Sequence, residues 1–416
     1  MAGLLARSGA GEAEGTLQLD GTAGVVFQDP ESQLVLARAG DDVAFGLENT
    51  GVPASEIWSR VDTALCAVGF PYGRDRSTAA LSGGEKQRLA IAGVLALRPN
   101  VLLLDEPTAN LDPLGAQLVR GALRPVLANR TCVMVEHRIA EALDLIDRVV
   151  VIAAGGGVIA DGTPERVFRE QGTALAAAGI WVPGPPPLAP PRRGTPSNAI
   201  VVEARDLTFA YPGSAASALD GVSVVLRSGR TVALVGANGS GKSTLALLIG
   251  GLLRPSRGAA RDAGGADLAR LRAGDLILRV GSVFQDPEHQ FVTGRVVDEL
   301  TIGPLRAGRA PLEARRLAND LLERMGLAAL GAANPFTLSG GEKRRLSVAT
   351  ALATAPGALI LDEPTFAQDR RTFGEILALL ADFRDRGGAL CFASHDPFLV
   401  DALADERLTL IAGRIQ

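Results

Sequence analysis

Short apolar runs alternate along the chain with longer segments that have the periodicity of helices. The short runs lie at 102–104, 149–152 and 359–361, and a further run at 231–235 leads into a Gly-rich turn and an apolar, helix-forming segment. This alternation is typical of βα units, whose strands form a mostly parallel sheet packed with helices. We therefore predict an α/β fold with mixed, mostly parallel sheets, plus a helical subdomain in each half.

A Pro-rich segment at 183–199 interrupts this pattern. It contains seven prolines and shows no apolar periodicity, so we expect a stiff, extended linker. The predicted domains are therefore 1–182 and 200–416, on either side of the linker.

The two halves repeat each other. VVFQDPESQLV at 25–35 returns as SVFQDPEHQFV at 282–292, and LSGGEKQRLAIAGVLALRP at 81–99 returns as LSGGEKRRLSVATALATAP at 338–356. VLLLDEPTANLD at 101–112 returns as ALILDEPTFAQD at 358–369, and the spacing from Gln28 to Ser82 equals that from Gln285 to Ser339. A period of this length indicates two homologous domains rather than a solenoid, whose units span roughly 20–50 residues.

The second half carries a phosphate-binding motif. Its sequence fits GxxxxGK[ST]. A chance Gly-rich turn is the alternative, but the predicted strand before the motif and the predicted helix after it favour the phosphate-binding interpretation. In such a P-loop, backbone N–H groups surround phosphate oxygens, the lysine contacts the β and γ phosphates, and the serine hydroxyl ligates Mg²⁺. The candidate nucleotide-binding residues are Gly236, Asn238, Gly239, Ser240, Gly241, Lys242, Ser243 and Thr244.

The first half has no corresponding loop. Residues 1–5 (MAGLL) match 249–253 (IGGLL), so the first half begins where the helix after that loop would end. We expect a misassigned start codon with the missing segment encoded upstream, and a genuine truncation is the alternative. The first domain is accordingly predicted to be N-terminally truncated and to lack the P-loop strand of its sheet.

Together these motifs resemble those of the ATP-binding-cassette (ABC) ATPases over nearly the whole chain apart from the linker. LSGGE resembles the signature motif of that family, which contacts the γ-phosphate of ATP held by the opposite domain. The resemblance implies that the two cassettes pair within the chain and form one complete ATP site. It assigns the signature role to Ser82, Gly83 and Gly84 and to Ser339, Gly340 and Gly341.

The resemblance also assigns catalytic roles at the ends of the strands that precede each Asp-Glu pair. Asp105 and Asp362 occupy the family's Mg²⁺-binding position, and Glu106 and Glu363 occupy the position that polarises the attacking water. Phosphoryl transfer needs little covalent chemistry from the protein, so catalysis depends on positioning and charge. The expected cofactors are ATP and Mg²⁺, with Ser243, Asp362 and Gln285 as the metal-binding residues.

Two of the three histidines occupy equivalent places in the repeat. His137 and His395 follow apolar runs at nearly the same distance after the Asp-Glu pairs, where the family carries its switch histidine. A lone histidine is most often structural, but recurrence at the same repeat position favours the catalytic interpretation.

Gln28 and Gln285 resemble the family's Q-loop residue, because each lies at a fixed spacing from LSGG. In the family this glutamine reaches Mg²⁺ and the attacking water. Tyr211 corresponds to the aromatic residue that stacks on adenine, and a role in the core or in a turn is the alternative.

Composition narrows the range of partners. A net charge of −4 and 4% aromatic residues provide neither an electrostatic nor a stacking surface for nucleic acid, so no nucleic-acid partner is expected. Three scattered cysteines fit a reduced cytosolic protein. No apolar run reaches the roughly 18 residues that a membrane-spanning helix needs. Any pore would therefore belong to other chains.

Two segments resemble the ATPases of energy-coupling factor importers: DDVAFGLENTGVP at 41–53 and EHR at 136–138. Such importers take up vitamins or transition-metal ions. The resemblance implies a peripheral position on the cytoplasmic face of the membrane, bound to a transmembrane coupling protein and a substrate-binding membrane protein. Residues 33–35 and 290–292 are the predicted contacts, although an amphipathic loop and helix without a partner would have the same pattern.

Two other functions fit a tandem cassette. One is a soluble protein that acts on ribosomes or nucleic acid, but the linker is short and carries only Arg192 and Arg193 as charges. The other is the ATPase of a sugar importer with tandem cassettes.

Overall fold

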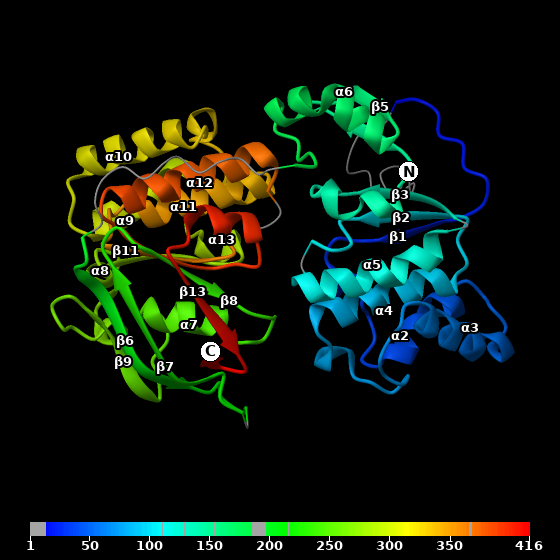
Figure 1. Cartoon of the computed structure of the whole chain (residues 1–416), viewed down its shortest axis with the longest axis horizontal. Helices are drawn as coiled ribbons and strands as arrows, with labels where there is room; N and C mark the ends of the chain where they lie inside the picture. Colours follow the sequence, from blue (N-terminus) through cyan, green and yellow to red (C-terminus); the bar gives the residue numbers. More distant parts are fainter. Residues whose placement is uncertain are drawn as a thin grey trace. The chain divides into compact units, whose positions relative to one another are not determined.

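The computed structural model (Figure 1) describes residues 14–109, 111–128, 130–153, 155–184, 197–214, 216–365 and 368–416. Its contacts divide the chain into two compact units, one of residues 1–176 and 181–183 and the other of residues 177–180 and 184–416. Residues 185–196, which form most of the predicted linker, lie outside the described ranges. Residues 1–5, on which the expected upstream start depends, also lie outside them.

The second unit is built on a six-stranded sheet with the order β10–β11–β12–β8–β13–β14. All neighbours in this sheet are parallel except β13 and β14, which are antiparallel. The strands most enclosed by this order, β11, β12 and β8, are buried almost throughout, as expected where helices and a second sheet cover both faces. The strand bounds are β8 Thr231–Val235, β10 Val280–Val283, β11 Ala358–Asp362, β12 Ala389–Ala393, β13 Glu406–Ile411 and β14 Arg414–Ile415.

A second, antiparallel sheet of the same unit has the order β7–β6–β9. Its strands are β6 (Ile200–Phe209), β7 (Leu219–Arg227) and β9 (Arg257–Asp262). Helix α7 (Lys242–Ile249) shares one apolar core with this sheet and with β8, β11 and β12. That core holds the N-terminus of α7 next to the ends of the central strands, where ligands bind in open α/β sheets.

The remaining helices of the second unit follow the antiparallel sheet in sequence. In Figure 1, α9 to α12 lie together above the central sheet, and β6, β7 and β9 lie below it. Helix α11 begins directly after the signature serine, and α12 begins after the segment that follows the Asp-Glu pair. The helix bounds are α8 Ala273–Leu276, α9 Val296–Arg306, α10 Pro311–Arg324, α11 Gly340–Leu352, α12 Arg370–Asp385 and α13 Pro397–Leu403.

The first unit contains a parallel sheet with the order β1–β2–β3 and an antiparallel hairpin, β4–β5. Helices α2 to α5 pack with β1 and β2 around one apolar core. The strand bounds are β1 Ala23–Val26, β2 Val101–Asp105, β3 Thr131–Val135, β4 Val149–Ile152 and β5 Val158–Gly162. The helix bounds are α2 Ala39–Asn49, α3 Ala54–Ala67, α4 Gly83–Ala96, α5 Pro113–Leu127 and α6 Pro164–Ala177.

Strand β3 differs from its counterpart β12 in the second unit. β12 is buried throughout and lies between β11 and β8, the strand that leads into the P-loop. Among the described residues, β3 pairs with β2 alone, and its Val133 and Val135 side chains are exposed. The described sheet of the first unit therefore ends at the position that the P-loop strand occupies in the second.

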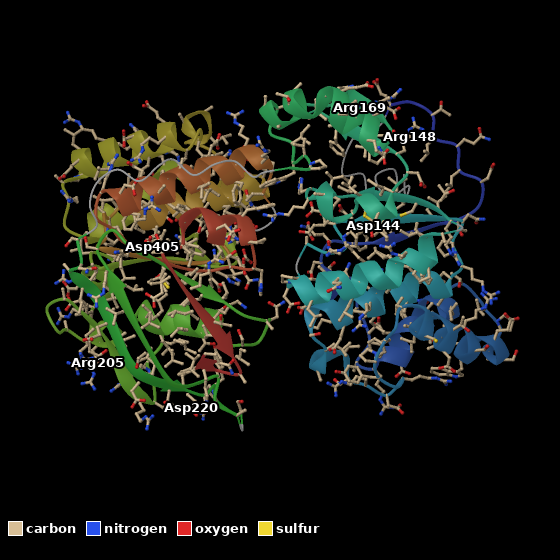
Figure 2. All side chains as sticks on the ribbon, in the orientation of Figure 1. Asp144, Arg148, Arg169, Arg205, Asp220 and Asp405 are labelled. Carbon is tan, nitrogen blue, oxygen red and sulfur yellow. The ribbon has the colours of Figure 1, made fainter. Side chains whose placement is uncertain are left out.

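Charged side chains cover the surfaces of both units (Figure 2). Asp220 of β7 pairs with Arg414 of β14 at 2.6 Å. Exposed pairs of this kind contribute only about 0–1 kcal/mol. Asp405 has a structural role instead, because its carboxylate accepts a hydrogen bond of 2.8 Å from the backbone N–H of Thr231 and so joins the starts of β13 and β8.

The predicted fold class is confirmed. The apolar runs at 102–104, 149–152, 231–235 and 359–361 lie in β2, β4, β8 and β11, and a helix follows the Gly-rich turn as expected. In the part of the chain that the structure describes, every helix is too short or too polar to cross a membrane.

Candidate nucleotide-binding site

The P-loop of the second unit connects β8 to α7. Gly236, Gly239 and Gly241 have φ angles of 146°, 77° and 106°, which glycine adopts without steric penalty. A Cβ on Gly236 would lie 2.3 Å from the carbonyl oxygen of Leu410, and one on Gly241 would lie 2.7 Å from that of Ala218. The close approach of other backbone segments therefore requires glycine at both ends of the loop.

Lys242 is the first residue of α7, and its side chain is buried against the loop. Its Nζ donates hydrogen bonds to the carbonyl oxygens of Gly236 at 2.8 Å and Ala237 at 3.0 Å. The ammonium group consequently lies within the loop, next to the N–H groups at the start of α7. A helix N-terminus and a buried cation together suit a phosphate group.

Ser243 and Asp362 lie together beside Lys242. The Ser243 hydroxyl donates a hydrogen bond to the Asp362 carboxylate at the end of β11. Burial raises the pKa of Asp362, whereas this hydrogen bond and the charge of Lys242 lower it. One hydroxyl and one carboxylate fit Mg²⁺, which keeps several waters and binds through one or two carboxylates plus substrate phosphates. Clusters of three or more His, Cys, Asp or Glu side chains that could form an all-protein metal site do not occur among the described residues.

Glu363 has a strained backbone, with a φ angle of 46°. Its carboxylate accepts hydrogen bonds of 3.0 Å from the Ser394 hydroxyl and of 3.0 Å from the backbone N–H of His395. Burial raises the pKa of Glu363 to about 7, against the opposing effect of Ser394. A carboxylate with a pKa in this range can act as a general base near neutral pH.

His395 connects Glu363 to the P-loop. Its Nε2 lies 2.8 Å from Asn238 Oδ1 and 3.6 Å from Glu363 Oε1. The structure thus brings together residues from the P-loop, the end of β11 and the end of β12. Each of these three sites was predicted separately from the sequence.

Tyr211 precedes β7 and lies close to the P-loop helix. Its hydroxyl is 3.2 Å from Thr244 Oγ1, and its ring packs edge-to-face on Phe209. Tyr211 is 45% exposed, so part of its ring is accessible for stacking on a base.

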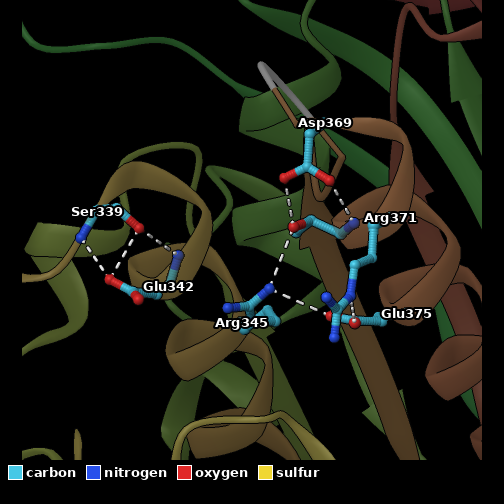
Figure 3. A network of polar contacts seen from close by, with 7 residues as sticks. Ser339, Glu342, Arg345, Asp369, Arg371 and Glu375 are labelled. Atoms are coloured by element: carbon cyan, nitrogen blue, oxygen red, sulfur yellow. Dashed lines mark hydrogen bonds and ion pairs between the residues drawn. The ribbon is translucent and has the colours of Figure 1, made fainter. Parts of the chain in front are cut away.

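Both signature motifs lie at helix N-termini. Ser339 forms a capping box at the start of α11, in which the Glu342 carboxylate accepts the Ser339 N–H at 2.8 Å (Figure 3). Ser82 donates the same bond to Glu85 at the start of α4. A Cβ on Gly340 would meet nothing within 4 Å. The backbone at that position is therefore open to an incoming group.

Arg345 connects the signature helix α11 to α12 within the second unit. Its Nη1 donates to the Thr372 hydroxyl at 3.1 Å and lies 3.2 Å from the Glu375 carboxylate (Figure 3). Asp369 caps α12 by accepting hydrogen bonds from the Thr372 N–H at 2.9 Å and its hydroxyl at 2.7 Å. The start of α12 is therefore fixed relative to α11.

The first unit brings its own three predicted residues together. The Glu106 carboxylate accepts a hydrogen bond of 3.2 Å from Gln28 Nε2, and His137 Nε2 lies 3.0 Å from it. Glu106 also has a positive φ, 42°, like Glu363. The described part of this unit contains no counterpart of Lys242.

Sequence reasoning did not identify Arg344 as a functional residue. This side chain lies in α11 and donates to the backbone carbonyls of Phe284 and Gln285 in the Q-loop. The available signal was the difference between EKRRL in the second half and EKQRL in the first. That difference has no evident meaning until the side chain is placed in three dimensions.

Comparison with known proteins finds relatives along most of the chain. The family described as ABC transporter matches residues 8–109 and 219–366. A Bacillus subtilis protein, YkoD, named for HMP/thiamine import, is 35% identical over 96% of this chain and 76% of its own length. A Methanosarcina acetivorans protein, named as an ABC transporter ATP-binding protein, is 32% identical over 94% of this chain and 71% of its own length.

Among solved structures, the archaeal ribosome recycling factor aABCE1, in complex with the ribosomal stalk protein aP1, is similar to 95% of this chain and 73% of its own length. The TM-score is 0.63 and the sequence identity is 20%. A likeness at this identity shows the shared fold alone.

Proposed function

This chain belongs to the ABC transporter family as a tandem ATP-binding cassette ATPase, and we propose that it drives a membrane importer of the energy-coupling factor type. The expected ATPase class is thereby confirmed. The relationship to a protein named for HMP/thiamine import supports uptake of a vitamin or a related small molecule. The proposed location is the cytoplasmic face of the membrane, next to a transmembrane coupling protein and a substrate-binding membrane protein.

The arrangement around Glu363 is the observation that carries the hydrolytic assignment. We propose that Glu363, held by Ser394 and His395, polarises the attacking water, and that His395 contacts the γ-phosphate. Lys242 and the start of α7 bind the phosphates. Proton abstraction by a buried carboxylate positioned through hydrogen bonds follows the general pattern of base catalysis.

Ser243, Asp362 and Gln285 are proposed to hold Mg²⁺. When bound there, the ion neutralises charge on the β and γ phosphates. Tyr211 stacks on the adenine in this proposal.

Ser82, Gly83 and Gly84 contact the γ-phosphate of ATP bound at the P-loop of the paired cassette. Ser339, Gly340 and Gly341 are the equivalent signature residues of the second cassette. Gln28, Glu106 and His137 are the catalytic candidates of the first cassette, for which no P-loop is predicted.

The loops after the two Q-loop residues support contact with a membrane partner. Asp42 accepts hydrogen bonds from the Val35 N–H at 2.7 Å and the Leu36 N–H at 2.7 Å. These bonds fix the loop in a conformation that leaves the Val35 side chain 62% exposed.

The second unit has the same arrangement. The buried Glu299 accepts hydrogen bonds from the backbone N–H groups of Val292, at 2.7 Å, and Thr293. Val292 is 72% exposed. Apolar side chains presented on a fixed backbone suit a hydrophobic partner surface, because little conformational entropy is lost on binding.

A pull-down from solubilised membranes tests the importer assignment. The full chain is expected to recover polytopic membrane proteins, and the double variant Val35→Asp, Val292→Asp is expected to lose them while it retains ATPase activity. Ile152→Asp, at an equally exposed site on β4, is the matched control. Recovery of ribosomes by the unaltered chain would favour the soluble tandem-cassette alternative. If the double variant still recovered the membrane proteins, the proposed contact surface would be contradicted.

A further inference from the structure

Helix α11, which begins at the signature serine, carries a buried guanidinium group that reaches the Q-loop. Arg344 is 3% exposed. Its Nη1 donates to the carbonyl oxygen of Phe284 at 2.7 Å, and its Nη2 donates to that of Gln285. A single side chain thus connects the signature helix to the backbone of the residue proposed to reach Mg²⁺ and the attacking water.

The charge of Arg344 also interacts electrostatically with carboxylates of the site. Burial lowers the pKa of Arg344 to about 10, and the carboxylates of Glu363, Asp362 and Asp286 oppose this decrease. The guanidinium is therefore charged at neutral pH. Its Nε has no hydrogen-bond partner among the described residues, so the two Nη groups make its directional contacts, and both go to the Q-loop.

The first unit has a glutamine at the equivalent position. Gln87 is 2% exposed, and its Nε2 lacks a hydrogen-bond partner within the described part of the chain. The glutamine side chain is shorter than that of arginine and carries no charge. The same helix position is therefore occupied by a buried arginine in the second unit and by a buried glutamine in the first.

The Q-loop of the first unit is held by a different residue. Gln33 Nε2 donates to the carbonyl oxygen of Val25 at 3.1 Å, and its Oε1 accepts the Phe27 N–H at 3.1 Å. In the second unit the equivalent Gln290 instead contacts α11, where its Oε1 accepts the Ser347 hydroxyl at 2.7 Å. The Q-loop backbone is thus held by its own loop in the first unit and by the signature helix in the second.

We propose that Arg344 is a positioning residue for Gln285, and this inference rests on the function proposed for the P-loop site. Through its two bonds to the Q-loop backbone, Arg344 aligns the Gln285 side chain with Mg²⁺ and the attacking water. It also makes that alignment depend on the position of α11. Gln87 does not provide this alignment in the first unit.

The test compares Arg344→Gln and Arg344→Lys in the full chain with Arg384→Gln. Arg384 is also a buried arginine, 4% exposed, but it pairs with Asp385 in α12 and lies outside the site. Binding of a fluorescent ATP analogue is measured with and without Mg²⁺, together with steady-state kcat and KM. Gln87 shows that this fold accommodates glutamine at the equivalent position, so Arg344→Gln is expected to fold.

Arg344→Gln is expected to leave the affinity for the Mg²⁺-free nucleotide unchanged, because Lys242 and the P-loop are intact. The gain in affinity caused by Mg²⁺ and the value of kcat should each fall roughly 10- to 100-fold, the usual effect of removing a residue that orients a metal ligand. Arg344→Lys keeps the charge and can make one of the two bonds, so it should lie between wild type and Arg344→Gln. Arg384→Gln should preserve the Mg²⁺-dependent gain in affinity.

The proposal is overturned if Arg344→Gln retains the Mg²⁺-dependent gain and kcat per folded molecule. An equal loss in Arg384→Gln would also overturn it, since the effect would then reflect general destabilisation. If Arg344→Gln does not fold, the lysine variant decides by the same readouts. Glu363→Gln distinguishes a failure of the function proposed for the P-loop site from a failure of the role proposed for Arg344. Turnover that persists in Glu363→Gln would contradict the proposed site. Turnover that is lost in Glu363→Gln but unchanged in Arg344→Gln would contradict only the role of Arg344.

Discussion

The Ser394 hydroxyl donates a hydrogen bond of 3.0 Å to the Glu363 carboxylate. At the equivalent position the first unit has Glu136, so the donor is replaced there by a second acid. Burial raises the pKa of Glu136, and the nearby Glu106 carboxylate raises it further. A hydroxyl stabilises an ionised neighbour, whereas a second carboxylate destabilises it. Glu363 therefore accepts a hydrogen bond that stabilises its ionised form, whereas the first unit has no hydroxyl donor at the equivalent position.

Ser394→Ala tests this relationship. The substitution removes a hydrogen bond to a charged group, which is worth about 1.5–3 kcal/mol. It should therefore shift the acidic limb of the pH–kcat profile upwards by about one to two units and lower kcat at neutral pH. Ser256→Ala, which removes an exposed hydroxyl bonded to the Thr208 carbonyl, serves as the control. An unshifted profile in Ser394→Ala would show that this hydroxyl does not influence the catalytic base.

Glu363→Gln should stabilise the second unit at alkaline pH in the absence of nucleotide. Burial raises the pKa of Glu363 to about 7. An acid whose pKa is higher in the folded state favours folding below its unfolded pKa, near 4.5, and that stabilisation is lost as the pH rises through about 7. The variant should therefore exceed wild type in unfolding free energy at pH 8 by on the order of 3 kcal/mol, and the difference should decrease towards pH 5.

The two units can be followed separately in this measurement. Both tryptophans, Trp58 and Trp181, belong to the first unit. A transition in urea that changes far-UV circular dichroism without changing tryptophan fluorescence therefore reports on the second unit. The exposed Glu323→Gln is the control. A pH-independent difference between Glu363→Gln and wild type would contradict the elevated pKa.

The P-loop illustrates what sequence patterns can predict. Its glycines permit a backbone with positive φ angles, and Lys242 follows them at a fixed position in the chain, so the motif can be recognised from neighbouring residues alone. The strands were equally predictable from the sequence, because apolar runs such as 358–361 are buried on both faces. These predictions need no knowledge of how distant segments pack.

Contacts between distant segments could not be predicted in this way. His395 and Asn238 are separated by 157 positions, and their contact depends on β12 lying next to β8. The orientation of Arg344 towards the Q-loop depends on the rotation of α11 about its axis. The sequence does not predict this rotation, because the apolar residues of α11 do not form a clear stripe along one face of the helix. Such relationships require the tertiary structure, because neither residue identity nor spacing specifies them.

Lys242→Ala should weaken nucleotide binding and lower turnover at the second unit. The buried ammonium group is the only charge within the described P-loop, 236–243, and it approaches the Gly236 and Ala237 carbonyls in a position suited to phosphate. Loss of such a preorganised electrostatic contact typically reduces turnover by about 10²–10³-fold. Lys343→Ala, which removes a lysine paired with Glu288 in the same unit, is the control. Turnover that survives Lys242→Ala would place hydrolysis elsewhere.

Cysteine alkylation provides a direct measure of opening in the central sheet of the second unit. Burial raises the pKa of Cys391, in β12, to about 12, whereas Cys66 is exposed. Because the thiolate is the reactive form, N-ethylmaleimide at pH 8 should modify Cys66 rapidly and Cys391 only when β12 separates from its neighbours.

Bound ATP provides the internal control for this labelling. A ligand that binds the folded state reduces the population of opened molecules, so ATP with Mg²⁺ should slow modification of Cys391 and leave that of Cys66 unchanged. Peptide mapping by mass spectrometry separates the two sites. Since β12 pairs with β8, which leads directly into the P-loop, protection of Cys391 that is lost in Lys242→Ala would locate the nucleotide at this unit. Equal protection in Lys242→Ala and wild type would contradict that location.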